Sequence, residues 1–308
     1  MNEASQVPAD TDTELRSTIN ASVREVALLA DVSISVWSGE RTDKRIMDEA
    51  KKQAGATGNV GRAIKNLMAG ADTKLKEAHS AFAGMRATHY SLTLPYVSDP
   101  HAQRQRGPRL LPNALFMPYL EAMGGKKRVA MAAVDALCAS YEEDKERARA
   151  NLGDLADSDY PTVEEIRSLF RAEFSFEPIP QGADFVNLPE FALKRLSSTL
   201  TERQATAVAS AMRGMWEVAR ERIEHLAEVM AVPDKTFKES TIIQAADLGQ
   251  LLPGWAIDGD PRALEVAATV TDMLRGVDAK LIRKDGAVRA ELADKARALM
   301  VKLNEWGV

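Results

Sequence analysis

Lysine and arginine residues concentrate in one stretch of the chain, which suggests a surface that binds phosphates. Residues 36–128 contain 16 Lys and Arg and 8 Asp and Glu, whereas the rest of the chain contains 24 and 37. Cations on loops and helix ends can contact the phosphate backbone of a nucleic acid at little structural cost. The residues that we predict to bind nucleic acid are Arg41, Lys44, Arg45, Arg62, Arg104, Arg106, Arg109, Lys126, Lys127 and Arg128.

Aromatic residues near these cations in the sequence could stack on unpaired bases. They are Trp37, Tyr90 and Tyr96, and such stacking is typical of proteins that bind single strands. We therefore expect a single-stranded nucleic acid to be favoured. The sequence contains no recognised groove-reading motif, so a second interpretation stays open, in which these charges solvate loops or pair with the acidic remainder of the chain.

One glycine-rich loop, GATGNVGRAIK, places Gly55, Gly58 and Gly61 ahead of Arg62 and Lys65. If a helix began there, its backbone N–H groups and the two cations could bind a phosphate. The glycine and lysine spacing differs from that of a Walker A loop or a dinucleotide fingerprint. We therefore interpret the loop as an ordinary connection.

Residues that catalyse reactions or bind metals show no known spacing. The four histidines include no His-x-x-x-His pair, and the single cysteine, Cys138, excludes a Cys/His zinc framework. Cys138 is expected to be buried, the acidic run 142–146 to form a solvated helix face, and His225 to lie on a wet helix edge. Asp260 before Pro261 is expected to cap a helix. We predict no catalytic residue, cofactor or metal; an enzyme with a site of scattered residues is a third possibility.

Periodicity predicts a mainly α protein, a multi-helix bundle with a long coiled-coil-like helix and a small accessory β-sheet. Alternation predicts strands in VSISVW, YSLTLPY and EFSFEPIP. In TVEEIRSLF, Thr162 and Glu165 form a capping box, so a helix should start there. The other helices are expected at 11–29, 43–53, 60–68, 72–88, 111–122, 126–152, 189–232, 235–252, 261–275 and 286–306.

The longest predicted helix, 189–232, has features of a coiled coil. Asn187 can cap it and Pro189 fits its first turn. Trp216, Ile223 and Met230 recur every seven residues, a spacing typical of helices that pack against a partner. These three residues are the predicted partner interface. The alternative function is therefore a protein–protein adaptor or a self-assembling structural component, with a homo-oligomer as the expected state.

Composition indicates a folded, soluble protein. Of the 308 residues, 45% are hydrophobic and 28% are charged, unlike the composition of disordered chains. We expect a disordered N-terminus at 1–10, an N-terminal helical region at 11–158 with the basic segment and short strands, and a C-terminal helical bundle at 159–308, or one continuous domain. The start of the chain lacks the features of a secretion signal, and no stretch has the roughly 18 apolar residues of a membrane span. We therefore expect a cytoplasmic protein with no membrane association.

Several blocks of sequence, taken in order, resemble a known family. They are YSLTLPY, RLLPNALFMPYLEAM, YEEDKERARANLGDLADSDYPTVEEIRSLF and FEPIP, followed by TFKESTIIQAADLGQLLPGWAIDGDP and LRGVDAKLIRKDGAVRAELADKA. The family is an uncharacterised phage and proteobacterial one, known only as a domain of unknown function, number three-one-five-zero. The resemblance spans nearly the whole chain and implies a shared fold without an active site. It also implies a phage or mobile-element protein in the host cytoplasm, with a MoxR-like AAA ATPase as a possible partner.

Overall fold

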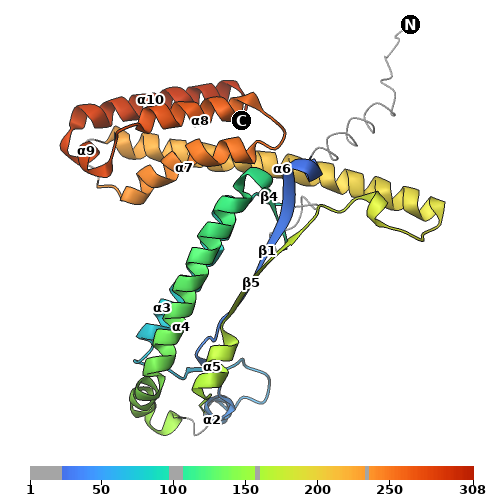
Figure 1. The fold of residues 1–308 in the computed structure, drawn as a ribbon. Coiled ribbons are helices and arrows are strands. Elements are labelled where there is room, and N and C mark those ends of the chain that lie inside the picture. The colour runs from blue at the N-terminus through green and yellow to red at the C-terminus, as the bar shows by residue number, and fades with distance from the viewer. Residues whose placement is uncertain (1–22, 97–106, 157–159, 233–235) are drawn as a thin grey trace. The chain divides into compact units, whose positions relative to one another are not determined.

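The computed structural model describes residues 23–308 apart from 97–106, 157–159 and 233–235 (Figure 1). Most of the described chain is helical, and two small sheets account for the strands. The predicted fold class, mainly α with one very long helix and a small sheet, is confirmed. The predicted disordered segment 1–10 lies outside the described residues.

The chain divides into two compact units that alternate along the sequence. Unit 1 contains the described residues up to Asp31, those of Tyr90–Pro118, and those of Ser175–Val308. Unit 2 consists of Val32–His89 and Tyr119–Phe174. The chain therefore passes from one unit to the other four times, whereas the sequence-based division followed chain order with one boundary after residue 158.

Helices form most of unit 1. The longest helix, α6 (Glu190–Ala231), packs against α7 (Glu239–Trp255) and α10 (Gly286–Glu305), and α7 packs against α8 (Pro261–Leu274). A short helix, α9 (Ala279–Lys284), precedes α10. Asp260 accepts a hydrogen bond from the backbone N–H of Arg262 at the start of α8, which confirms the predicted cap.

The predicted partner interface on α6 lies in the core of unit 1. Trp216, Ile223 and Met230 are 7%, 0% and 2% exposed, so their side chains have no surface left for another chain. The spacing of seven residues correctly predicted that this side of α6 packs against other helices, but those helices, α7 and α10, belong to the same unit. The prediction of a partner interface at these three residues is therefore wrong.

Unit 2 is organised along most of the long helix α4 (Phe116–Leu152). It also contains β2 (Glu40–Thr42), α2 (Lys44–Ala54), β3 (Ile64–Asn66), most of α3 (Thr73–Leu92) and α5 (Val163–Leu169). The predicted capping box at α5 is confirmed, because the Thr162 side chain accepts from the Glu165 N–H and the Glu165 carboxylate accepts from the Thr162 N–H. Cys138 on α4 is buried, as predicted, and burial raises the pKa of its thiol.

A three-stranded sheet has the order β4 (Arg109–Pro112), β1 (Ala27–Ser35), β5 (Arg171–Glu177). Strands β1 and β4 are antiparallel, with Ala27 opposite Pro112 and Ala30 opposite Arg109. The predicted strands at 32–37 and around Phe174 and Phe176 are thus confirmed within β1 and β5. The third predicted strand, YSLTLPY, is wrong, because α3 continues to Leu92 and only Leu94 forms a bridge, to Leu110.

Several predicted helix boundaries are wrong for identifiable reasons. The first helix ends at Val26 rather than Leu29, because residues 27–35 pair as the central strand of the sheet. The helix expected at 60–68 is absent, since Gly61 has a φ of +130° and 64–66 pair with β2. Asn187 does not cap α6; it adopts a left-handed conformation, φ 62°, two residues before the N-cap Pro189.

The helices expected at 111–122 and 126–152 are a single helix, α4, which continues through Gly124 and Gly125. A Cβ atom at either glycine would meet only the end of the Arg128 side chain, at 3.9 Å. Glycine in a helix interior costs about 0.5–1 kcal/mol relative to alanine. The packing of α4 before and after Gly124 and Gly125 therefore offsets the cost of these two glycines.

We expect Gly124→Ala and Gly125→Ala to stabilise the protein, each by about 0.5–1 kcal/mol, because both positions are helical and open. Urea denaturation followed by circular dichroism measures the change. Gly55→Ala is the matched control with the opposite sign, since Gly55 ends α2 with a φ of +64°. A loss of stability in both α4 variants would mean that the helix is interrupted at these glycines.

Candidate nucleic-acid interface

Four of the ten predicted nucleic-acid-binding residues lie in one short part of unit 2, Glu40–Asn66, which we call the basic module. Strands β2 and β3 close the module by antiparallel pairing, with Arg41 opposite Lys65, and α2 lies between them (Figure 1). The four residues are Arg41 on β2, Lys44 and Arg45 at the start of α2, and Arg62 in the loop before β3. All four side chains are exposed.

Helix α2 separates cations from apolar residues. Residues three, four, seven and eight positions apart lie on the same side of a helix, so Lys44, Lys51 and Lys52 share one side, with Asp48 between them. Ile46 and the alanines lie on the other side. No residue of α2 is buried, so its cationic side faces solvent.

A buried ion pair fixes the module. Lys65 Nζ lies 2.8 Å from Asp43 Oδ2, and both side chains are at most 5% exposed. Hydrogen bonds from Arg45 and Lys65 hold the pKa of the Asp43 carboxyl well below its usual range. Lys65 also donates to the Leu155 carbonyl at 2.8 Å, which attaches β3 to the chain just after α4. Lys65 is therefore a structural residue.

No anion site exists at the helix ends where the sequence suggested one. No helix follows the glycine-rich loop, so the phosphate site considered there is wrong; Gly55 instead ends α2 and Arg62 lies in the loop. The start of α2 is also occupied, because Asp43 Oδ1 accepts the Arg45 N–H at 2.9 Å. Phosphate binding at the basic module would thus depend on side-chain cations.

Four cations of the module differ in ion pairing from most cations of α3 and of the second half of α4. Among the described residues, no carboxylate pairs with Lys44, Lys51, Lys52 or Arg62. By contrast, most cations of α3 and of the second half of α4 have a carboxylate partner. These pairs are Lys74–Glu77, Lys76–Asp72, Lys145–Glu142, Arg147–Asp144 and Arg149–Glu146.

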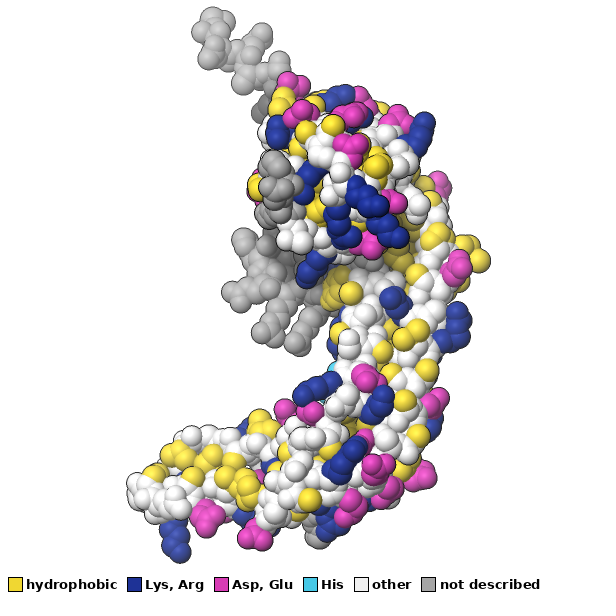
Figure 2. Space-filling model, turned by 90° about the vertical axis from the view of Figure 1, so that its left-hand side faces the viewer, with side chains coloured by type: hydrophobic (Ala, Val, Ile, Leu, Met, Phe, Trp, Pro, Cys, Tyr) yellow, Lys and Arg dark blue, Asp and Glu magenta, His cyan; other side chains and the backbone are white. Residues whose placement is uncertain are grey.

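The excess of basic residues in the segment 36–128 does not become an excess of positive charge in unit 2. Unit 2 contains 18 Lys and Arg and 18 Asp and Glu, because the second half of α4 and α5 add acidic residues to the basic segment. Figure 2 likewise shows basic and acidic side chains interspersed on the visible face. The charge of the unit therefore does not set the basic module apart; the module offers four cations without a carboxylate partner among the described residues, and the exposed Arg86, Lys126 and Arg128 of the same unit also lack one.

Lys126, Lys127 and Arg128 lie in the interior of α4 rather than at the start of a separate helix, as predicted. Lys126 and Arg128 are exposed, and the Lys127 ammonium lies 5.7 Å from the centre of the Phe174 ring. At 1.5 Å per residue, Lys127 is roughly 37 Å along the helix from Leu152, the end near which Lys65 is attached. The two groups of cations do not form one surface.

Arg109 is a structural residue, which corrects its prediction as a phosphate contact. It is 7% exposed, and its guanidinium donates to the Thr93 hydroxyl at 2.7 Å and to the Thr93 carbonyl at 2.8 Å. The Tyr90 ring covers it at 4.6 Å, and burial lowers the pKa of Arg109 to about 10. Sequence shows the charge but not its burial in β4. Arg104 and Arg106 lie outside the described residues.

The aromatic residues assigned to base stacking have other contacts. Trp37 is 8% exposed and packs edge-on against Tyr141, with ring centres 6.0 Å apart. Tyr90 packs against Arg109. Burial thus removes Trp37 as a stacking platform, whereas Tyr90 is 48% exposed and Tyr96 is half-buried. Lys51 and Lys52 were not among the predicted residues, although their spacing of seven and eight residues from Lys44 places them on one side of α2.

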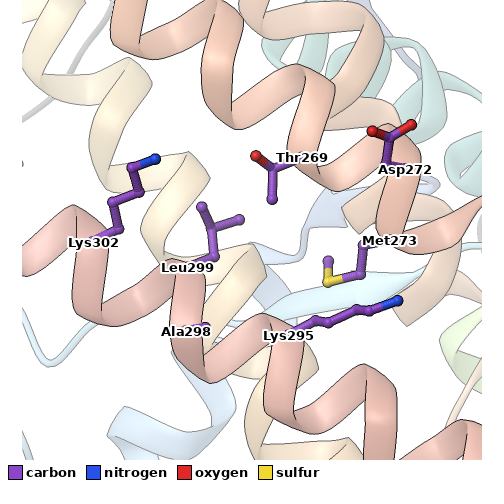
Figure 3. A pocket seen from close by; sticks show the side chains of 7 residues that line it. All are labelled: Thr269, Asp272, Met273, Lys295, Ala298, Leu299 and Lys302. Atoms are coloured by element: carbon purple, nitrogen blue, oxygen red, sulfur yellow. The ribbon is translucent and has the colours of Figure 1, made fainter.

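The surface of unit 1 has a separate groove between α8 and α10 (Figure 3). Its lining residues are Thr269, Asp272, Met273, Lys295, Ala298, Leu299 and Lys302. The lysines pair with Glu291 and Glu265, and Asp272 pairs with Arg275. Because its charged groups already have partners, we assign the groove no ligand.

Among the described residues, no group of three or more His, Cys, Asp or Glu side chains is arranged to hold a metal ion. In the same part of the chain, no helix has the length and apolar composition that a membrane span requires. The chain matches no family model, no curated protein and no solved structure.

We expect Lys65→Met to lower the thermal midpoint by several degrees, because it removes the buried partner of the Asp43 carboxylate and leaves only the exposed Arg45 to pair with it. The depressed pKa of Asp43 also predicts a pH dependence. Its stabilising contribution is present above the unfolded pKa of about 4 and is lost as the pH falls below it.

Asp43→Asn should therefore flatten the acid limb of a stability–pH profile measured by thermal unfolding. Asp48→Asn, which changes an exposed carboxylate on α2, is the control and should leave both the midpoint and the profile unchanged. Equal effects of Asp43→Asn and Asp48→Asn would contradict the structural role of the ion pair.

Proposed function

We propose that this protein is a non-enzymatic one that binds nucleic acid through the basic module. The observation that supports this is a set of cations, the exposed Lys44, Lys52 and Arg62 and the half-buried Lys51, that have no carboxylate partner among the described residues. Elsewhere in unit 2, cations such as Lys74 and Arg149 are paired. The module therefore has cations available to a polyanion.

Pairing matters because a phosphate must compete with any carboxylate already in contact. An unpaired surface lysine loses only water and small counterions when a phosphate binds, and counterion release from the nucleic acid favours the complex. A paired lysine must also lose its intramolecular partner. The module should thus supply more of the binding free energy than an equal number of cations on α3 or α4.

The buried Asp43–Lys65 pair supports the same proposal by a different route. It attaches β3 to the start of α2 and to the chain after α4, so Lys44 and Arg62 project from one small framework. A surface fixed in this way loses less conformational entropy on binding than cations on a loose tail.

The biological setting follows from the sequence resemblance and is part of the proposal. We propose a phage or mobile-element protein that acts in the host cytoplasm. Membership of the uncharacterised family, number three-one-five-zero, and a partnership with a MoxR-like AAA ATPase stay predictions, each of which co-purification from the native host would test.

A second candidate function, a protein–protein adaptor or self-assembling component, rests on an exposed apolar cluster in unit 1. Phe185, Val186, Leu188 and Phe191 are 38%, 74%, 41% and 79% exposed within seven residues at the start of α6. Exposed apolar patches often mark protein contacts. Light scattering after size exclusion distinguishes a monomer from a homo-oligomer, and a Phe191→Ser variant tests whether the cluster is responsible.

We expect the combined variant Lys44→Gln, Lys52→Gln, Arg62→Gln to bind oligonucleotides more weakly than the unmodified protein. Each phosphate contact removed should reduce the slope of log affinity against log salt by about 0.7 for a single strand. Fluorescence anisotropy over a range of salt concentrations measures both quantities.

The matched control neutralises three exposed lysines of unit 1, Lys238, Lys280 and Lys284, to glutamine, with the same change in net charge. Its salt slope should stay that of the unmodified protein. If the control and the module variant weaken binding equally, the binding reflects overall charge and the site assignment is wrong.

Removing acidic residues from the same face should have the opposite effect. Asp48 lies between the lysines of α2 and Glu49 follows it, and both carboxylates would repel a bound phosphate. We expect Asp48→Asn with Glu49→Gln to strengthen binding severalfold at low salt and to raise the salt slope. Neutralising Glu224 and Glu228, exposed acids one turn apart on α6 that pair with no cation among the described residues, is the control with the same change in charge and should have little effect.

A further inference from the structure

The basic module has no side chain that can stack on a base. Residues 38–66 contain no Phe, Tyr, Trp or His. The large apolar side chains exposed in the module are aliphatic, Val60 at 55% and Ile64 at 62%. Stacking on aromatic side chains contributes about 1–3 kcal/mol per base in proteins that bind single strands, and this contribution is missing here.

The amide side chains that could read base edges are mostly engaged in turns. Asn59 Oδ1 accepts the Gly61 N–H at 3.3 Å, and Asn66 Oδ1 accepts the Met68 N–H at 2.9 Å. Gln53 is the remaining amide of the module. Direct recognition of bases depends on amide or guanidinium groups placed in a groove, so in the module it could come only from Gln53 and from the arginines Arg41, Arg45 and Arg62.

We propose that the basic module binds the phosphate backbone of duplex nucleic acid without contacting the bases, which rests on the proposed function above. This replaces the single-strand preference expected from the sequence, since the three rings on which that preference depended, Trp37, Tyr90 and Tyr96, all lie outside the module, and Trp37 and Tyr90 pack against Tyr141 and Arg109. A duplex has one charge per roughly 1.7 Å of axis, and each phosphate contact contributes more to the salt slope there than on a single strand, about 0.9 against 0.7. Binding by cations alone therefore favours the duplex.

Backbone-only binding also implies indifference to sequence. The same cations meet the same phosphates whatever the bases are, so duplexes of different composition should bind with affinities within about twofold. Removing the bases from a single strand should likewise leave its affinity nearly unchanged.

The test compares the full-length protein on four fluorescent probes of equal length: a duplex, its single strand, a single strand of abasic sugar–phosphate units, and a duplex of different sequence. We expect the duplexes to bind most tightly and alike, with the abasic and natural single strands weaker and alike. A natural single strand that binds more tightly than the duplex, or at least about tenfold more tightly than the abasic strand, overturns the proposal because the bases then contribute.

A second variant separates apolar contacts from phosphate contacts. Val60→Ser with Ile64→Ser removes the exposed aliphatic groups of the module and leaves its cations in place. The affinity for the duplex should stay unchanged, and a marked loss would contradict backbone-only binding. The melting temperature of this variant shows whether it is folded.

The failure of this inference and the failure of the proposed function give different results. If no probe binds at low salt, the function itself is wrong; if probes bind but the single strand is preferred, only the present inference fails. Vesicles of phosphatidylserine and phosphatidylcholine are tested in parallel. Vesicle binding without any oligonucleotide binding would assign the cations and the exposed aliphatic residues to a lipid surface and overturn both.

Discussion

A long helix needs a partner along its apolar stripe, and this constraint explains most of the structure. Helices α4 and α6 span 37 and 42 residues, far more than propensity alone stabilises. On α4, buried residues run from Tyr119 to Ala148, and packing carries the helix through two glycines. On α6, burial begins only at Gln204, where α7 and α10 supply the partner surface.

The candidate site depends on a different property, the presence of cations that have no carboxylate partner among the described residues. Cations are abundant throughout unit 2, and five of them, Lys74, Lys76, Lys145, Arg147 and Arg149, pair with a carboxylate three or four residues away. The basic module keeps one ion pair buried, Asp43–Lys65, and leaves its other lysines in solvent. Burial of that pair costs desolvation that the hydrogen bonds to Arg45 and Leu155 offset. The module thus gains a fixed shape and keeps its charge.

The sequence was informative wherever a local interaction determined the structure. The Thr162–Glu165 capping box, the Asp260 cap and the long helix were predicted because neighbours in sequence decide them. Predictions failed where distant segments decide. Residues 27–29 have the spacing of a helix but pair as part of the central strand of the sheet. Arg109 was predicted to be exposed but is buried and hydrogen-bonded to Thr93. Arg41, Lys44, Arg45 and Arg62 were predicted and lie together; their closeness required the pairing of β2 with β3, which no local pattern revealed.

The alternation of the two units along the chain has a consequence for the order of events during synthesis. All residues of unit 2 precede Ser175, whereas unit 1 depends on helices encoded after that point. When the ribosome has synthesised the chain up to Phe174, all residues of unit 2 are present, whereas unit 1 still lacks helices α6 to α10. Leu115, which is buried in the finished protein and lies against Gly254 of α7, must wait for sequence made much later. The half-made chain therefore exposes an unfinished apolar surface, where a chaperone or the nascent chain of a neighbouring ribosome could bind.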